Sequence, residues 1–139
     1  MEYSEDVMED KFAISNLKTI HVGDSVVVQG KVAPGAKRFA INLGQDASNY
    51  LIHFNPRFDE NNVIVYNFKK DGKWGPEQRD DQFSFMWGEE TTVAFALNSG
   101  EVTVNYPGGH FEFKSQLNLD CVEYISVKGD FEVQSINIK

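Results

Sequence analysis

Short runs of alternating apolar and polar residues recur along the chain, separated by Gly, Pro, Asn and Asp. Within Arg38 to Leu43, for example, Phe39, Ile41 and Leu43 share one parity and polar or small residues share the other. A period of two is typical of a β-strand with one buried face, and no long apolar period of helical spacing appears. The pattern predicts an all-β jelly-roll β-sandwich of two antiparallel sheets, with about eleven short strands.

Two places depart from this regular pattern. Phe83 and Phe85 share the parity of Glu77 and Arg79, which would place both rings on the face of the polar residues. We therefore expect a break or bulge within Asp80–Gln82 that returns the rings to the other face. Residues 118–120, Asn-Leu-Asp, are expected to form one short helical turn.

The stretch from His53 to Arg79 carries polar side chains where a strand would place them together. His53, Asn55 and Arg57 fall at every second position, with Phe54 between them. A strand therefore puts the three polar side chains on one face and the aromatic ring on the other.

Further polar residues follow in the same stretch. Val63–Phe68 is a second alternating run that carries Asn67, and Trp74, Glu77 and Arg79 follow a turn at residues 70–72. If these segments are neighbours in one antiparallel sheet, the indole ring of Trp74 lies among charged and amide side chains. This composition indicates a binding site for a polar ligand.

Length and charge limit the class of protein. The 139 residues suit one domain, which we place at residues 11–139 behind an acidic, mobile N-terminal extension at residues 1–10. A net charge of −8 argues against nucleic acid as a partner. The absence of a run of 18 apolar residues argues against membrane insertion.

The cysteine content and the N-terminus indicate a cytoplasmic protein. Cys121 is the single cysteine, which suits a reducing compartment. The first residues are acidic and lack the basic and apolar regions of a conventional signal peptide.

Metal and nucleophilic chemistry find no support in the sequence. His21, His53 and His110 are scattered, and no pair has ligand spacing on one element, so we expect no metal and no cofactor. No nucleophile elbow or glycine-rich phosphate loop is present.

Glycoside hydrolysis requires two carboxyl groups across the scissile bond, one of them a general acid. Glu77 is close in sequence to Arg79 and is expected to meet Arg57 as well, which favours its ionised form. Asp59 and Glu60 are interpreted as loop groups in water, as are residues 80 and 81. The sequence therefore predicts that the protein is not an enzyme.

Binding of a sugar explains the same residues better. Trp74 can cover the apolar face of a sugar ring. Arg57 and Arg79 donate forks of N–H groups, Glu77 accepts, and asparagine side chains do both.

Three motifs closely resemble the galectin carbohydrate-recognition signature: His53-Phe54-Asn55-Pro56-Arg57, Val65-Tyr66-Asn67 and Trp74-Gly75-Pro76-Glu77-Gln78-Arg79. The resemblance covers nearly the whole chain after the acidic extension. It implies a single-domain, prototype-like β-galactoside-binding lectin for lactose or N-acetyllactosamine glycans, without metal or catalysis.

The resemblance also implies a role for each site residue. His53, Asn55 and Arg57 would hold the axial 4-hydroxyl of galactose, and Asn67 and Glu77 the 6-hydroxyl. The neighbouring sugar would meet Arg57, Glu77 and Arg79, and the galactose ring would stack on Trp74.

Two features set this chain apart from many galectins. The segment Phe58–Tyr66 is shorter than in many mammalian single-domain members, which could alter contacts to the second sugar. Arg38 is a candidate contact for an extended or sulfated glycan, and a solvated arginine is the alternative.

The resemblance implies a homodimer joined through the terminal strands, expected at Phe12–Leu17 and Phe131–Ile138. Such a dimer would cross-link glycoproteins and glycolipids as an agglutinin, after export from the cytoplasm without a signal peptide. The alternative is a structural or protein-interaction protein of the same fold with vestigial sugar binding.

Overall fold

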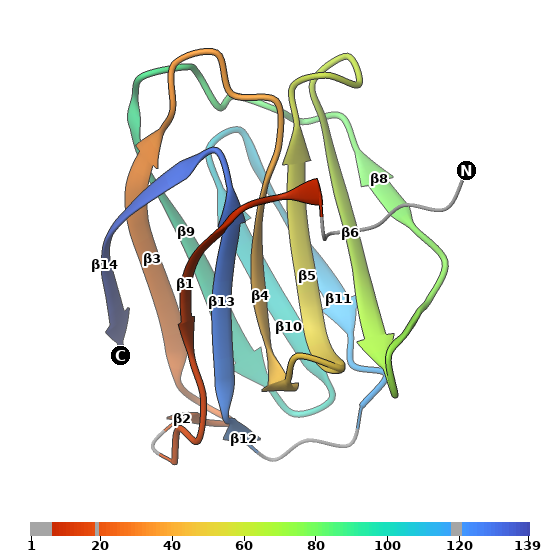
Figure 1. The fold of residues 1–139 in the computed structure, drawn as a ribbon. Coiled ribbons are helices and arrows are strands. Elements are labelled where there is room, and N and C mark those ends of the chain that lie inside the picture. Colours follow the sequence, from red (N-terminus) through yellow and green to blue (C-terminus); the bar gives the residue numbers. More distant parts are fainter. Residues whose placement is uncertain (1–6, 19, 118–120) are drawn as a thin grey trace.

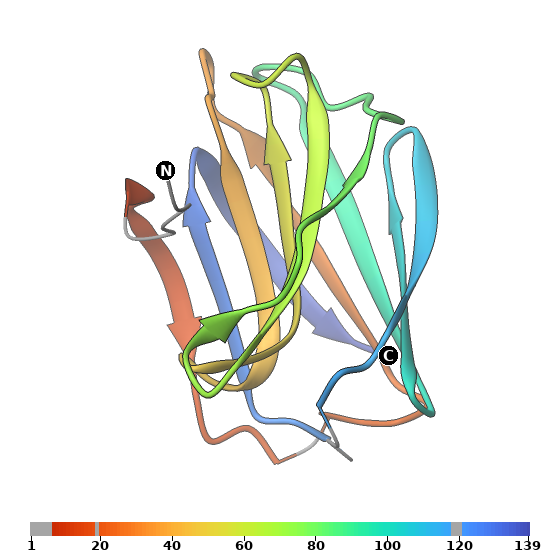
Figure 2. The same ribbon diagram turned by 90° about the vertical axis from the view of Figure 1, so that its right-hand side faces the viewer.

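The computed structural model describes residues 7–18, 20–117 and 121–139, and this part of the chain forms strands β1 to β14 and no α-helix. Two antiparallel sheets lie face to face (Figures 1 and 2). The seven-stranded sheet contains, in spatial order, β1 (Asp10–Ile14), β13 (Tyr124–Gly129), β4 (Phe39–Asp46), β5 (Asn49–Arg57), β6 (Val63–Lys70) and β7 (Lys73–Trp74), with β8 (Gln78–Asp80) also paired to β6.

The second layer is a five-stranded sheet. Its strands, in spatial order, are β11 (Gly109–Lys114), β10 (Glu101–Tyr106), β9 (Glu90–Asn98), β3 (Ser25–Val32) and β14 (Phe131–Ile138). A small third sheet pairs β12 (Cys121–Val122) with β2 (Ile20–His21). None of the described residues forms a helix of the length and apolarity needed to cross a membrane.

The core lies between the two large sheets and is rich in aromatic rings. Phe39 stacks on Phe131 with ring centroids 4.6 Å apart, and Phe54 meets Phe95 edge to face at 6.0 Å. All four rings are fully buried. Because alternate residues of β4 and β5 are committed to this core, the residues between them face the outer side of the seven-stranded sheet.

The predicted all-β sandwich of antiparallel sheets is confirmed. The expected number of strands was too low, since the described residues form fourteen. The additional strands include β2, β7 and β12, which have two residues each and are too short to show an alternating pattern.

The first terminal strand differs from its expected bounds. We expected Phe12–Leu17, whereas β1 spans Asp10–Ile14, and Asn16 has a left-handed φ of 59° beyond its end. The start is earlier because Asp10 pairs with Lys128 on β13, with an ion pair of 3.2 Å between their side chains. The last strand, β14, has the expected bounds.

Part of the expected N-terminal extension is described. Met8 is 8% exposed, and the carbonyl of Glu9 accepts a hydrogen bond of 2.7 Å from the Gly129 N–H. Residues 1–6 of that extension, and the helical turn expected at residues 118–120, lie outside the described residues.

The expected break after Arg79 is present as a strand end. Strand β8 stops at Asp80, whose carboxylate accepts a hydrogen bond of 2.8 Å from the Gln82 backbone N–H. The chain then carries Phe85 into the core, where it is 5% exposed. Because the strand ends before Phe85, this ring can enter the core although it shares the sequence parity of Glu77 and Arg79.

Strands β4 and β5 shift register near their connection. A Cβ on Gly44 would lie 2.0 Å from the carbonyl oxygen of Asn49, so only glycine allows this close approach. The shift turns Tyr50 towards the ring of His53, on the outer face, while Leu51 and Ile52 both belong to the core.

Candidate carbohydrate-binding site

The outer face of the seven-stranded sheet brings together all seven residues that the sequence singled out. His53 pairs with Asn67 across β5 and β6, and Val65 of β6 pairs with Arg79 of β8. Asn55 and Arg57 follow His53 at alternate positions of β5. Trp74 and Glu77 come from β7 and from the loop before β8. We call this surface the site face.

His53 lies at the floor of the site face. It is 1% exposed, and its Nδ1 lies 2.6 Å from Oδ1 of Asn42 on the neighbouring strand β4. Burial, reinforced by the positive charges of Arg57 and Lys69, lowers the pKa of His53 from 6.5 to about 3. The imidazole is therefore neutral at physiological pH.

Arg57 is the buried cation of the site. Its side chain is 3% exposed, and its Nε donates a 2.9 Å hydrogen bond to Oδ1 of Asn55. The amide nitrogen of Asn55 donates in turn to the carbonyl of Phe39 at 2.8 Å. The sheet backbone thus fixes Asn55, and Asn55 fixes the guanidinium plane.

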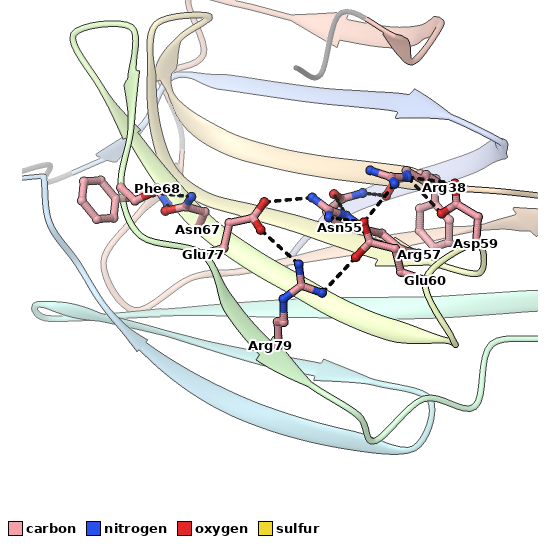
Figure 3. A network of polar contacts seen from close by, with 11 residues as sticks. Arg38, Asn55, Arg57, Asp59, Glu60, Asn67, Phe68, Glu77 and Arg79 are labelled. Carbon is pink, nitrogen blue, oxygen red and sulfur yellow. Dashed lines mark hydrogen bonds and ion pairs between the residues drawn. The ribbon is translucent and has the colours of Figure 1, made fainter. Parts of the chain in front are cut away.

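Two carboxylates and two guanidinium groups form a closed ring of ion pairs (Figure 3). Arg57 contacts Glu60 at 2.9 Å and Glu77 at 3.0 Å. Arg79 contacts Glu60 at 2.9 Å and Glu77 at 3.2 Å. Each carboxylate therefore contacts both arginines of the ring, so the ring is ordered before any ligand arrives.

Trp74 covers one end of the site face. Its ring centroid lies 4.6 Å from that of His53 and 5.8 Å from that of Tyr50. The Nζ of Lys69 lies 5.0 Å from the ring centroids of both Trp74 and Tyr50. These contacts fix the indole beside the buried histidine, where its surface can meet the apolar side of a sugar ring.

Asn67 holds the loop that carries Trp74 and Glu77. Its amide nitrogen donates to the carbonyl of Gly75 at 2.8 Å, and its Oδ1 accepts from the Phe68 backbone N–H at 2.8 Å. Exposure rises across the site, from 3% for Asn67 to 50% for the side chain of Arg79. The site is therefore closed at its floor and open at its Arg79 end.

An open groove of about 1320 Å³ lies on the site face and is lined by five of the seven residues: Arg57, Asn67, Trp74, Glu77 and Arg79. Its lining also includes the Val7–Glu9 segment and Asp130. The segment that precedes β1 therefore contributes to the groove on the site face.

Arg38 is engaged in ion pairs on the site face. Its Nε lies 2.9 Å from the Asp59 carboxylate and its Nη2 lies 3.0 Å from Glu60. It also lines the groove, so it stays a candidate contact for an extended glycan, with its charge balanced by two carboxylates.

The interpretation of Glu60 as a loop group in water is wrong. Its carboxylate contacts three arginines, at residues 38, 57 and 79. Partial burial opposes its ionisation, but the bonds from Arg79 and Arg57 outweigh this effect, so its pKa lies below the ordinary 4.5. The sequence did contain a signal for a turn here, the Asn61-Asn62 pair, because asparagine tolerates the left-handed conformation. In the structure these two residues have φ of 58° and 57° and turn the chain directly after Glu60.

Asn42 and Tyr50 were also missed as site residues. The alternation placed Asn42 on the outer face without a role, yet it is fully buried against His53. Tyr50 reaches the site face through the register shift described above. In both cases the contact joins two strands, and a single strand pattern does not contain it.

We expect Glu60→Gln to weaken lactose binding about threefold, a loss typical of one hydrogen-bonded pair. The amide keeps the shape of the side chain but removes the charge that orients Arg57 and Arg79. Calorimetric titration measures the effect. Asp59→Asn is the matched control, because Asp59 contacts Arg38 on the outer side of the ring; equal losses in both variants would contradict a special role for Glu60.

Within the described ranges, no group of three or more His, Cys, Asp or Glu side chains is placed to hold a metal ion. The chemistry of the site face consists of hydrogen-bond donors, acceptors and one large ring.

Comparisons with known proteins agree on one family. A profile of the family described as "Galactoside-binding lectin" matches residues 11–138. The "16 kDa beta-galactoside-binding lectin" of chicken (Gallus gallus) is 38% identical over 132 residues, covering 93% of this chain and 98% of that protein.

Two solved structures have the same fold. "CG-16, a homodimeric agglutinin from chicken liver" superposes with a TM-score of 0.87 at 37% identity, covering 92% of this chain and 98% of the other. Toad ovary galectin in complex with N-acetylgalactose gives a TM-score of 0.86 at 36% identity, covering 92% and 97%. With the sandwich, the site face and these similarities together, the chain belongs to the galactoside-binding lectin family.

Proposed function

We propose that the protein is a non-catalytic, metal-independent lectin that binds β-galactosides on its site face. The observation that carries the proposal is the fixed geometry of the seven residues. Buried asparagine and histidine groups form the floor, an ordered ring of ion pairs forms one end, and Trp74 forms the other. Sugar hydroxyls can exchange hydrogen bonds with such groups, and the apolar side of galactose suits the indole.

The position of each residue supports the division of roles that the family resemblance implies. His53, Asn55 and Arg57 lie together at the floor, where an axial 4-hydroxyl would enter. Glu77 and the more exposed Arg79 lie towards the open end, where a neighbouring sugar would extend into solvent.

Retention on lactose–agarose, with elution by free lactose, tests the proposal. A correctly folded sample that passes through the column would support the alternative, a structural or protein-interaction protein with vestigial sugar binding. The intact ring of ion pairs favours the lectin over this alternative, because a site that no longer bound sugar would not need it.

We propose further that two chains form a dimer through their terminal strands and thereby cross-link glycoconjugates. Within the described part of the chain, β1 and β14 are the outermost strands at one side of their sheets (Figure 1). A groove is lined by residues of both strands. The similar chicken protein CG-16 is a homodimeric agglutinin. Edge strands that pair with a second copy give a closed two-fold dimer, and two sites would act by avidity.

We expect the double variant Ile14→Lys with Ile138→Lys to be monomeric and to bind lactose with unchanged affinity per site. Both side chains are 41% exposed, and lysine at a strand edge opposes pairing. Sedimentation velocity is expected to show twice the chain mass of 15.8 kDa for the unmodified protein and a single chain for the variant. Met86→Lys, at a 58% exposed position outside both terminal strands, is the control. A variant that stays dimeric would place the interface elsewhere.

We also propose that the protein is made in the cytoplasm and reaches extracellular glycans without a signal peptide. The single free Cys121 supports a reducing site of synthesis, because the fold needs no disulfide. Fractionation of cells and medium with an antibody would test this; processing through the secretory pathway would contradict it.

A further inference from the structure

Three side chains behind the sugar site form a hydrogen-bonded chain across three neighbouring strands. Strands β13, β4 and β5 lie side by side (Figure 1). Ser126 of β13 pairs with Asn42 of β4, and Asn42 pairs with His53 of β5, so all three residues occupy one row of the sheet. The amide nitrogen of Asn42 donates to Oγ of Ser126 at 3.0 Å, and Oδ1 of Asn42 lies 2.6 Å from Nδ1 of His53. Each of the three residues is at most 1% exposed.

The direction of this chain determines where the imidazole carries its proton. Because the nitrogen of Asn42 faces Ser126, its oxygen faces His53 and can only accept. Nδ1 of His53 must then carry the hydrogen, and in a neutral imidazole Nε2 is left as an acceptor.

We propose that Asn42 and Ser126 are positioning residues that hold His53 as a hydrogen-bond acceptor towards the ligand. The inference rests on the proposed function, since it concerns the same site. It adds a requirement on the ligand: the hydroxyl group that meets His53 must donate its hydrogen.

The surrounding charges favour this arrangement. Positive charges face His53 from Arg57 on its own strand, from Lys69 on β6 and from Lys128 on β13. Burial opposes a second proton on the ring most strongly, and these charges add to it, while a hydrogen bond with Asn55 acts in the opposite direction. The net effect lowers the pKa of His53, so the imidazole stays neutral and Nε2 stays an acceptor. The three cations do not select between the two neutral tautomers, and that selection falls to Asn42.

The first test is the tautomer of His53 in the ligand-free protein. Two-dimensional ¹H–¹⁵N spectra of the imidazole ring distinguish Nδ1–H from Nε2–H. We expect Nδ1–H in the unmodified protein and a mixture of tautomers in Ser126→Ala, because the Asn42 amide can then rotate. An Nε2–H tautomer in the unmodified protein would overturn the proposal.

The second test is the affinity for lactose. We expect Ser126→Ala to bind about fivefold more weakly and Ser126→Thr, which restores a hydroxyl, to recover most of the loss. Thr103→Ala is the control, since Thr103 accepts a hydrogen bond from Asn98 on the opposite sheet. A loss that Thr does not recover, or no loss in Ser126→Ala, would contradict the role of Ser126.

The third test changes the partner of the ring without removing it. Asn42→Asp places a carboxylate beside Nδ1, which favours the charged imidazolium. We expect lactose affinity to be flat from about pH 8 to pH 5 in the unmodified protein and to fall with pH in this variant. Equal pH profiles would overturn the proposal. Because the tautomer is measured without sugar, a failure of galactoside binding is distinguishable from a failure of this inference.

Discussion

The Arg57→Ala variant is expected to lose lactose affinity on the order of a hundredfold, the cost of removing one partner from a buried, hydrogen-bonded charge pair. Arg57 touches Asn55, Glu60 and Glu77, so its removal takes away a donor to the sugar and releases both carboxylates. The unfolding free energy is expected to fall as well, by about 2 kcal/mol. Calorimetric titration and urea unfolding measure the two effects.

Two variants make this result specific. Arg57→Lys keeps the charge but cannot contact three partners with a planar fork, and we expect it to stay strongly impaired. Arg38→Ala is the matched control, because the Arg38 side chain forms its ion pairs with Asp59 and Glu60, whereas Arg57 also holds Glu77 and Asn55. Near-normal lactose binding by Arg57→Ala would show that Arg57 does not contribute to the sugar site.

Acid is expected to destabilise the protein through His53. Its pKa is about 3 in the folded chain and 6.5 when unfolded, so between these values the unfolded chain binds the additional proton. Stability therefore falls as pH drops below about 6.5, with a limiting slope of about 1.4 kcal/mol per pH unit. Between pH 7 and pH 5 we expect a loss of about 2 kcal/mol from this residue.

Urea unfolding at several pH values measures this dependence. The His53→Gln variant is expected to show a shallower slope from pH 7 to pH 5, whatever its absolute stability. His21 and His110 are exposed and are retained in the variant, so they serve as internal controls. Parallel slopes in the two proteins would show that His53 is not buried in its neutral form.

The sequence was sufficient for the fold class and for the seven residues that the site face brings together, because both depend on local patterns. The period of two in β4 and β5 separates core residues from site residues, and it places His53, Asn55 and Arg57 together. The meeting of Glu77 with Arg79 followed from parity, and its meeting with Arg57 was also expected. Both are confirmed, by contacts of 3.2 Å and 3.0 Å.

What the sequence did not contain were contacts between distant segments. Glu60 contacts Arg79 and precedes a turn formed by two asparagines with left-handed φ. Asn42 contacts Ser126, which lies 84 positions later in the sequence. Tyr50 changes face because of a register shift that depends on Gly44. Predicting each of these contacts requires the three-dimensional arrangement of the strands, because tertiary packing and not sequence spacing determines which residues meet.

Calorimetric titration with lactose and with cellobiose tests the central claim most directly, because cellobiose carries glucose where lactose carries galactose. A site built around a buried acceptor at His53 and donors at Arg57 should reject a sugar whose hydroxyl does not reach them. We expect saturable binding of one lactose per chain and no measurable binding of cellobiose. Equal binding of the two disaccharides, or no binding of lactose by the folded protein, would contradict the assignment of the site face as a galactoside site.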